Sequence, residues 1–360
     1  MYWKIPSIPN KTPIKKPNYK IIFIFFVTII TAIYTYSVTL SAEQRIQLFF
    51  ITFPIIALLF FTCISFLYVR YQHSVITCHN WEKEKEITKN EWQAWCQSSI
   101  TSIANVIYTP DKDGTDVFLQ KAEAVPMFPD KPRRLFNNIQ LDQNLIVAID
   151  GQLERQCPNY RFYLSKIYIF DSNNSNENLI YENWQIKPIK SPRYQDVFSI
   201  YDDIEQSDTF LIITIQSKAE YSEFISAQLF STNSKVISLN NARIKVERIM
   251  EIDIQNIDDE IIKYIDYSGI SKKNKFQTWI TDNKQDLVDK LLITYTEKNI
   301  EFDKHNPIYS LALSYSIPHS NAFLTYLSLV SEISSKTETD QVLIHPNPYG
   351  ASYAVYIRRS

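Results

Sequence analysis

Two long apolar runs dominate the first part of the chain. Ile21 to Leu40 is a run of 20 residues without a charge, and Leu48 to Val69 is a second run of 22. At 1.5 Å per residue, each run is long enough as a helix to cross a hydrocarbon layer of roughly 30 Å. The polar connection Ser41 to Gln47 suits a tight turn. The pattern predicts a transmembrane hairpin over 21–69, and the lack of ionisable residues in both runs favours an anchor over an ion path.

Basic residues near these runs predict the orientation of the hairpin. Lysines 4, 11, 15, 16 and 20 precede the first run, Arg45 alone lies in the connection, and Arg70, Lys83 and Lys85 follow the second run. Because basic residues favour the cytoplasmic side, both termini are expected there. A cleavable signal peptide is not expected, since a second span follows at once. These features predict a two-helix protein of a bacterial inner membrane, with a basic cytoplasmic segment over 1–20.

The polar and apolar pattern beyond the hairpin predicts a juxtamembrane helical region over 70–123 and a cytoplasmic α/β domain over 124–360. An amphipathic helix is expected over 80–102, with tryptophans on one face, and a proline-rich loop over 124–134. Further helices are expected over 141–155, 194–205, 219–230, 257–267 and 284–298, with one or two between 307 and 331. Strands are expected over 104–108, 162–170, 210–215, 236–239, 244–252, 276–280, 341–344 and 352–357. This alternation predicts a layered α/β sheet.

Composition narrows the function classes. The net charge of −2 gives no reason to expect a nucleic-acid partner. The four cysteines, Cys63, Cys78, Cys96 and Cys157, show no CxxC spacing, so reduced, inert thiols are expected rather than zinc ligands or disulfides. Only 4 glycines occur, which fits a chain that makes few close backbone approaches to a ligand, although an AT-rich genome would deplete glycine as well.

Motifs with a known chemistry are absent from the sequence. The chain contains no GxGxxG, no GxxxxGK[ST], no HExxH and no GxSxG pattern, so a nucleotide site or a classical hydrolase site is disfavoured. The groups that remain as candidates are His305, His319 and His345, the acidic clusters 202–205 and 258–260, and the juxtamembrane His73, Cys78 and His79. Solvated helix faces, loops and an ordinary linker are the commoner explanation for all of them. We therefore assign no catalytic residue, cofactor or metal.

The second half of the chain resembles the β-ketoacyl synthases and thiolases. HPNPYGASYAVYIRR, His345 to Arg359, is similar to their last strand pair, and His305 to Val330 is similar to their G-H-x-x-G-A-A-G helix region. Asp208 to Ile215 would be the strand that follows the nucleophile helix. The resemblance covers about 185–360 and implies a thiolase-like fold.

The same resemblance implies that the catalytic residues are missing. The nucleophilic cysteine would lie near Ile186 to Ser191, yet no cysteine follows Cys157. The H-G-T-G-T block would fall near Ile280 to Lys284, which reads ITDNK. Only His305 is left as a counterpart of a catalytic histidine, and Gly350 is the only glycine left in the last loop. The implied fold is therefore degenerate, and acyl transfer by that route is not expected.

The layout of the whole chain resembles uncharacterised membrane proteins of enterobacteria encoded near type VI secretion genes. The similarity includes the patches NVIYTP, Asn105 to Pro110, and PMFPDKPRRL, Pro126 to Leu135. It implies an accessory or self-protection role beside that secretion machine.

Two functions remain open at this stage, and a third, membrane transport, is weakened. The first is a non-enzymatic protein that is anchored in the bilayer and binds a protein partner at the cytoplasmic face. The second is a membrane-bound enzyme for acyl or lipid groups, whose residues would come from His305, His319, His345, Asp202 and Asp258. Transport is disfavoured because only two uncharged spans are predicted.

Overall fold

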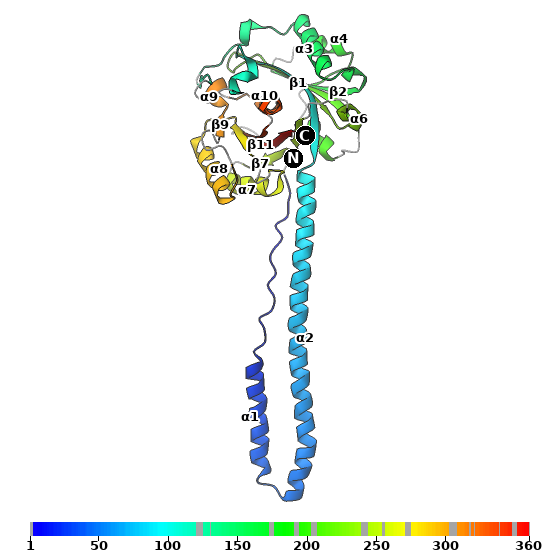
Figure 1. Ribbon diagram of the computed structural model, residues 1–360, viewed down its shortest axis with the longest axis vertical. Helices are drawn as coiled ribbons and strands as arrows, with labels where there is room; N and C mark the ends of the chain where they lie inside the picture. Colours follow the sequence, from blue (N-terminus) through cyan, green and yellow to red (C-terminus); the bar gives the residue numbers. More distant parts are fainter. Residues whose placement is uncertain are drawn as a thin grey trace. The chain divides into compact units, whose positions relative to one another are not determined.

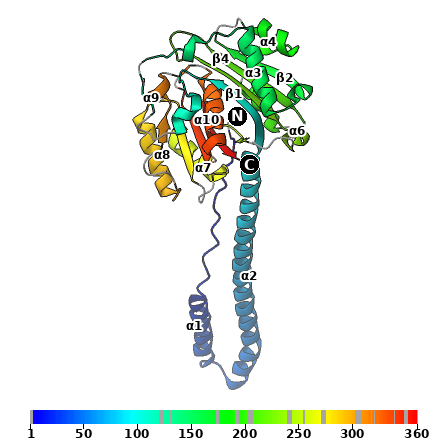
Figure 2. The same cartoon turned by 45° about the horizontal axis from the view of Figure 1, so that its top comes forward.

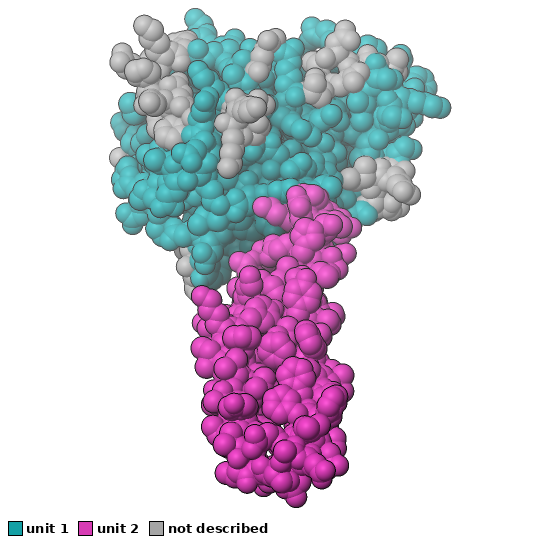
Figure 3. Space-filling view, turned by 60° about the horizontal axis from the view of Figure 1, so that its bottom comes forward, with its two compact units in different colours: residues 1–4, 92–360 teal, residues 5–91 magenta. Residues whose placement is uncertain are grey.

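The computed structural model describes residues 3–119, 125–129, 131–172, 176–190, 194–202, 207–238, 244–253, 256–270, 275–301, 308–316, 318–319, 321–337, 339–347 and 351–359. Its contacts divide the chain into two units, which Figure 3 colours separately. One unit comprises residues 5–91 and is called the hairpin unit below. The other comprises residues 1–4 and 92–360 and is called the globular unit.

The hairpin unit contains two helices that are long and apolar enough to cross a membrane. Helix α1 runs Tyr19–Ser37, and α2 runs Ala42–Cys96 and carries the second apolar run in its first half. The second predicted span, 48–69, falls within α2, whereas the first, 21–40, extends beyond the end of α1 at Ser37. Arg45 closes the turn between them, because its guanidinium donates to the carbonyls of Ser37 and Val38 at 3.1 and 3.2 Å. These carbonyls at the end of α1 have no partner within the helix, so the contact satisfies them.

Helix α2 continues without a break beyond its apolar half. The helix expected over 80–102 is therefore wrong as a separate element: its residues up to Cys96 form the last turns of α2, and a strand begins at Ser99. Within the hairpin unit, the extended N-terminal segment runs beside this polar part of α2 (Figure 1). Trp81 Nε1 donates to the carbonyl of Pro9 at 2.9 Å, and Lys11 Nζ lies 3.6 Å from the centre of the Trp81 ring.

The globular unit is built on one mixed sheet that consists of two half-sheets. The first has the order β3 (Ile189–Lys190), β2 (Leu164–Asp171), β4 (Thr209–Gln216), β5 (Phe224–Ser231) and β1 (Ser99–Tyr108). The second has the order β9 (Ile308–Ser310), β8 (Phe276–Ile280), β10 (Asp340–His345), β11 (Ser352–Arg359) and β6 (Ile244–Glu247), with β7 (Met250–Ile252) also paired to β11. Antiparallel pairing of β1 with β6 joins the two.

The two half-sheets repeat one topology. In each, the spatial order is third, second, fourth, fifth and first strand of that half, when β6 and β7, which both pair with β11, are counted together as the first strand of the second half. The second strand is parallel to both the third and the fourth, while the fifth is antiparallel to its two neighbours. The unit is therefore an internal duplication, which the sequence analysis did not detect.

Helices lie outside and between the half-sheets, as Figure 2 shows. Helices α3 (Gln143–Gln156) and α4 (Glu177–Trp184) cover the outer face of the first half-sheet and share an apolar cluster with it. Helix α10 (Ala322–Thr337), α5 (Tyr194–Val197) and the 3-10 turn η5 (Phe198–Asp202) lie in the cluster between the half-sheets. Helices α7 (Ile257–Tyr267) and α8 (Gln285–Glu297) cover the outer face of the second half-sheet. The result is a layered α/β fold.

Side-chain alternation along β8 fixes the order of these layers. Trp279 belongs to the cluster that contains α10, whereas its neighbour Thr278 lies 3.0 Å from the hydroxyl of Tyr295 on α8. Successive strand residues point to opposite faces, so α10 and α8 lie on opposite sides of this half-sheet.

Two predicted elements are wrong in type. The helix expected over 219–230 is instead strand β5 from Phe224, and the strand expected over 236–239 is instead the short helix α6, Ser234–Ser238. Every residue of β5 is buried because helices cover both faces of its half-sheet. A strand buried on both faces loses the alternation of polar and apolar residues that identifies strands in a sequence.

The other predicted elements are confirmed to different extents. The helix over 257–267 and the strand over 276–280 match α7 and β8 at both ends. The helix expected over 194–205 is found as α5 and η5 up to Asp202, and residues 203–206 lie outside the described residues. The segment 307–331 contains strand β9, which was not predicted, before α9 (Ala312–Tyr315) and α10. Strand β1 lies within the sheet, although its residues were assigned to the juxtamembrane region.

Candidate functional site

A pair of buried histidines lies at one edge of the second half-sheet. His345 is the last residue of β10, and Thr281 directly follows β8. His319 lies between β9 and the start of α10. Strands β8, β9 and β10 are parallel, so their carboxyl ends meet at this edge. In open α/β sheets this edge is the usual place for a ligand or an active site.

His345 is held by a direct polar contact. Its Nδ1 lies 2.7 Å from the hydroxyl oxygen of Thr281, and only 2% of the residue is exposed. Its ring centre lies 6.0 Å from that of Phe323 on α10. The contact fixes the ring plane at the end of β10.

His319 has one satisfied ring nitrogen and one unsatisfied one. The backbone N–H of Asn321 donates to Nδ1 of His319 at 3.1 Å, so the proton of the neutral ring is placed on Nε2. Nε2 is buried and has no hydrogen-bond partner in the described part of the chain. His319 therefore presents an unpaired donor inside the protein.

Burial keeps both imidazoles neutral near neutral pH. Desolvation, with a smaller contribution from the repulsion that a charged His345 would exert, lowers the pKa of His319 to about 3, and this repulsion shows that the two rings are near each other. Desolvation alone lowers the pKa of His345 to about 4. A neutral imidazole accepts a proton readily only where its charged form is stabilised, and burial at this edge destabilises the charged form.

Aromatic rings fill the space beside the histidines. The ring centre of Tyr194, at the start of α5, lies 5.3 Å from that of Tyr353 and 5.8 Å from that of Phe323. Phe323 and Tyr353 are themselves 4.9 Å apart. Burial raises the pKa of the Tyr353 hydroxyl to about 12, so it carries no charge in the physiological range. The region between α5 and β11 is packed with rings.

No described cysteine reaches this place. Cys157 caps α3 and belongs to the apolar cluster on the outer face of the first half-sheet. Cys96 ends α2, and burial raises the pKa of its thiol to about 12 despite the nearby charge of Arg248. A thiol with so high a pKa is not a nucleophile at neutral pH.

Among the acidic candidates, Glu260 is buried and pairs with Lys263 at 2.6 Å. Two others are found in exposed ion pairs. Asp202 pairs with Arg248 at 2.5 Å and its side chain is 66% exposed, while Asp258 pairs with Lys290 at 3.1 Å and its side chain is 61% exposed. Neither lines the buried edge. His305 and Gly350, with Asp203 and Glu205, lie outside the described residues.

The remaining candidates do not form a site in the part of the chain that the structure describes. His73 and His79 are exposed on α2, and Cys78 is half-buried on the same helix. No group of three or more His, Cys, Asp or Glu among the described residues is placed to hold a metal ion.

Sequence reasoning named both histidines but missed their partners. The segment ITDNK was expected to replace a histidine block, and its Thr281 turns out to hold His345. Tyr194 was seen only as the start of a helix. The usable signal was the position of Thr281 and His345 in the sequence. A polar residue directly after each of two buried parallel strands indicates that both residues lie at the same edge of the sheet.

Comparisons with known proteins show the fold. No protein-family model matches the chain, and no curated protein matches it by sequence. Among solved structures, AntDE:AntF, a type II polyketide synthase acyl-carrier protein with its ketosynthase, gives a TM-score of 0.54 at 8% identity, over 73% of this chain and 99% of that chain. A variant of OleA from Xanthomonas campestris gives 0.46 at 8% identity, over 73% and 99%. The 3-oxoacyl-[acyl-carrier-protein] synthase III from Aquifex aeolicus gives 0.41 at 9% identity, over 72% and 99%.

The first of these matches establishes a fold resembling that of the thiolases and of ketosynthase III. The sequence resemblance covered about 185–360, and the structural likeness extends over both halves of the duplication.

Proposed function

We propose that the chain is a non-enzymatic interaction protein, anchored in the bacterial inner membrane by its hairpin and carrying a degenerate thiolase-like unit that docks a protein partner in the cytoplasm. The link to type VI secretion, as an accessory or self-protection component, is part of this proposal and rests on the sequence resemblance alone.

One observation carries the non-enzymatic part of the proposal. At the strand edge that would hold a reaction centre, His319 and His345 have pKa values lowered to about 3 and 4, and the carboxylate of Asp282 pairs with Lys284 at 3.4 Å. Tyr194, Phe323 and Tyr353 pack beside them, and no cysteine follows Cys157 in the sequence. Acyl transfer through a covalent intermediate needs an activated nucleophile, which this arrangement does not supply.

The course of the chain supports the predicted hairpin topology. Trp3, which precedes α1, belongs to the globular unit: it is 1% exposed, and its ring centre lies 5.6 Å from Tyr264 and 6.5 Å from Trp95. Residues 1–4, before α1, and the residues after α2 therefore belong to the same folded unit. An even number of crossings is required between them, and the basic residues at 4–20 and 70–85 favour the cytoplasm for both ends.

A thioester assay tests the proposal. Full-length protein in detergent is incubated with lauroyl-CoA, and release of free thiol and acylation of the protein are followed. We expect no turnover above that of a denatured sample. Turnover that is lost in His319→Gln, while the variant keeps its fold by circular dichroism, would refute the proposal.

The alternative is a membrane-bound enzyme for acyl or lipid groups, and one observation favours it. The buried Nε2 of His319 has no partner in the described part of the chain, which is costly in a folded protein unless a ligand supplies the acceptor. The same assay separates the two, because an enzyme using this donor loses turnover in His319→Gln and a structural histidine changes only stability.

A further inference from the structure

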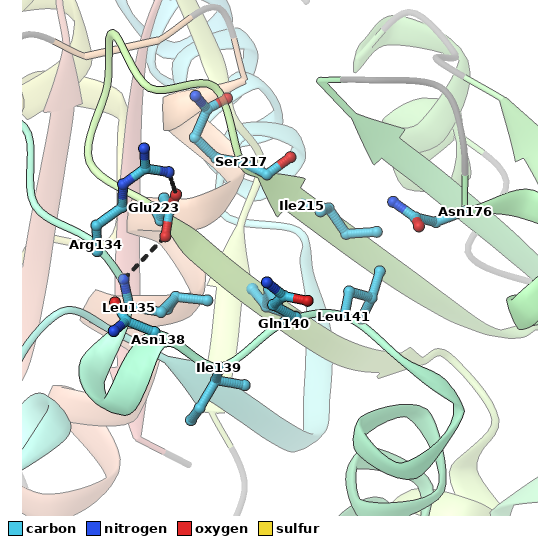
Figure 4. Close-up of a pocket in the computed structure, with 12 residues that line it drawn as sticks. Arg134, Leu135, Asn138, Ile139, Gln140, Leu141, Asn176, Ile215, Ser217 and Glu223 are labelled. Carbon is cyan, nitrogen blue, oxygen red and sulfur yellow. Dashed lines mark hydrogen bonds and ion pairs between the residues drawn. The ribbon is translucent and has the colours of Figure 1, made fainter.

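A cleft lies at the matching edge of the first half-sheet. It has a volume of about 460 Å³ and is bordered by the carboxyl end of β4, the start of β5 and the segment 134–141 (Figure 4). Cavities of roughly 300–1,000 Å³ are the usual size for ligand sites.

An ion pair fixes one end of the cleft. The buried carboxylate of Glu223 pairs with the Arg134 guanidinium and accepts the backbone N–H of Leu135 at 3.1 Å, as Figure 4 shows. The backbone N–H of Glu223 in turn donates to the carbonyl of Arg133 at 2.9 Å. These contacts hold the segment against β5 and leave the two opposite charges balanced.

The other end is fixed by a buried carboxylate beneath an amide. Asp171, 5% exposed at the end of β2, accepts both the backbone N–H and the side-chain N–H of Asn176, at 3.2 and 2.9 Å. The carboxamide oxygen of Asn176 is thereby oriented. The cleft is thus pre-formed at both ends.

Carboxamides and apolar side chains line the space between these ends. Asn138 and Gln140 contribute exposed carboxamides that make no hydrogen bond to another described residue, and Ile215 and Ile225 are buried lining residues. No aromatic side chain is among the lining residues that the structure describes. Each carboxamide offers one acceptor and two donors, which is the complement of a peptide unit.

This lining selects among ligand classes. A phosphate ligand would need unpaired positive charge, and Arg134, the arginine among the described lining residues, is neutralised by Glu223. Nucleobases and other flat π-systems are normally held by stacking on aromatic rings, which this cleft lacks. An uncharged extended peptide satisfies the carboxamides with its backbone and the isoleucines with an apolar side chain.

We propose that this cleft binds a short, extended, uncharged peptide segment of a protein partner, with Gln140 and Asn138 bonding its backbone and Ile215 receiving an aliphatic side chain. This deepens the docking function proposed above and rests on it.

Binding of a defined peptide set tests the cleft. Full-length protein in detergent is applied to an array of N-acetylated, C-amidated pentapeptides composed of Ala, Val, Leu, Ser and Asn. Gln140→Trp fills the cleft from an exposed position, and Gln140→Ala removes one hydrogen-bonding group. Gln143→Trp, an exposed residue at the start of α3 outside the cleft, is the matched control.

We expect a subset of peptides to bind the wild type and Gln143→Trp with equal affinity. The same peptides should bind Gln140→Ala about 2- to 10-fold more weakly and should show no measurable binding to Gln140→Trp. The proposal would be overturned if no peptide bound the wild type more tightly than Gln140→Trp. Binding of inorganic phosphate or maltose that is lost in Gln140→Trp would overturn the peptide assignment.

The same variant separates this inference from the docking function itself. A partner protein that co-purifies equally with wild type and Gln140→Trp, with no peptide discrimination, leaves the docking function standing and removes the cleft from it. Loss of the partner in Gln143→Trp as well would assign the effect to folding and contradict a specific role for the cleft.

Discussion

Replacing His319 and His345 together by glutamine is expected to reverse the pH dependence of stability between about pH 5 and 6. Both histidines are neutral in the folded chain over this range, because their pKa values are lowered to about 3 and 4 from an ordinary 6.5. The unfolded chain binds these two protons as the pH falls towards 5. Each histidine therefore contributes a stability that is present above pH 6.5 and is lost as the pH falls.

Glu247 acts in the opposite direction. It is 1% exposed, and burial raises its pKa to about 7 from 4.5 despite the hydrogen bond that the backbone N–H of Gly269 donates to it. The folded chain therefore keeps this proton between pH 5 and 6, whereas the unfolded chain releases it. The stability due to Glu247 is present below pH 4.5 and is lost as the pH rises towards 7.

The protons bound by these three residues in the folded and unfolded chain give the size of the expected change in the free energy of unfolding. In the wild type, the unfolded chain gains two protons on histidine and the folded chain keeps one on Glu247, so the net difference is one proton. The free energy of unfolding should rise by about 1.4 kcal/mol from pH 5 to pH 6. Without the two histidines only Glu247 is left, and the free energy should instead fall by about 1.4 kcal/mol over the same interval.

Urea-induced unfolding of the full-length chain in detergent, followed by tryptophan fluorescence at pH 5.0, 5.5 and 6.0, measures both slopes. His73→Gln with His79→Gln, exposed on α2, is the matched control and should keep the wild-type slope. Equal slopes in the wild type and the His319/His345 variant would refute the reasoning, since they would show that the histidines titrate alike in both states.

Three further outcomes follow from contacts described above. Trp3→Ala should lower the free energy of unfolding by about 3–5 kcal/mol in urea, since it empties a fully buried site, and an unchanged midpoint would contradict its burial. Gly269→Ala should cost about 1–3 kcal/mol, because its Cβ would clash with the carboxylate of Glu247; pairing it with Glu247→Ala should remove most of that cost. A membrane-impermeant maleimide should label Ser41→Cys from outside intact spheroplasts and the native Cys78 only after the cytoplasmic face is exposed; the reverse pattern would contradict the orientation.

Local signals in the sequence predicted much of the fold. The apolar runs, the amphipathic helix over 257–267 and the strand over 276–280 are each determined by residues close in sequence, and all are present. The wrong or missing predictions concern features that depend on contacts between residues distant in sequence. Strand β5 is covered on both faces, and the duplication depends on pairings between distant strands, which no local pattern encodes.

The candidate site was harder to predict for a related reason. His319 and His345 were singled out, but the sequence did not show that Thr281 lies 2.7 Å from His345 or that Tyr194 lies among Phe323 and Tyr353. These groups come together only because β8, β9 and β10 end at one edge. The cleft at Arg134 and Glu223 joins residues about 90 positions apart, and no motif indicates it.

Quantitative affinity purification from native membranes tests the docking claim most directly. The full-length wild type and the His319→Gln/His345→Gln variant are recovered in parallel, and co-purifying proteins are measured by mass spectrometry relative to the chain. The account predicts one protein in stoichiometric amount, recovered equally with both, because the histidines are structural. Recovery of the chain without a protein partner, together with thioester turnover that the variant lacks, would contradict it and assign the chain to the enzymes.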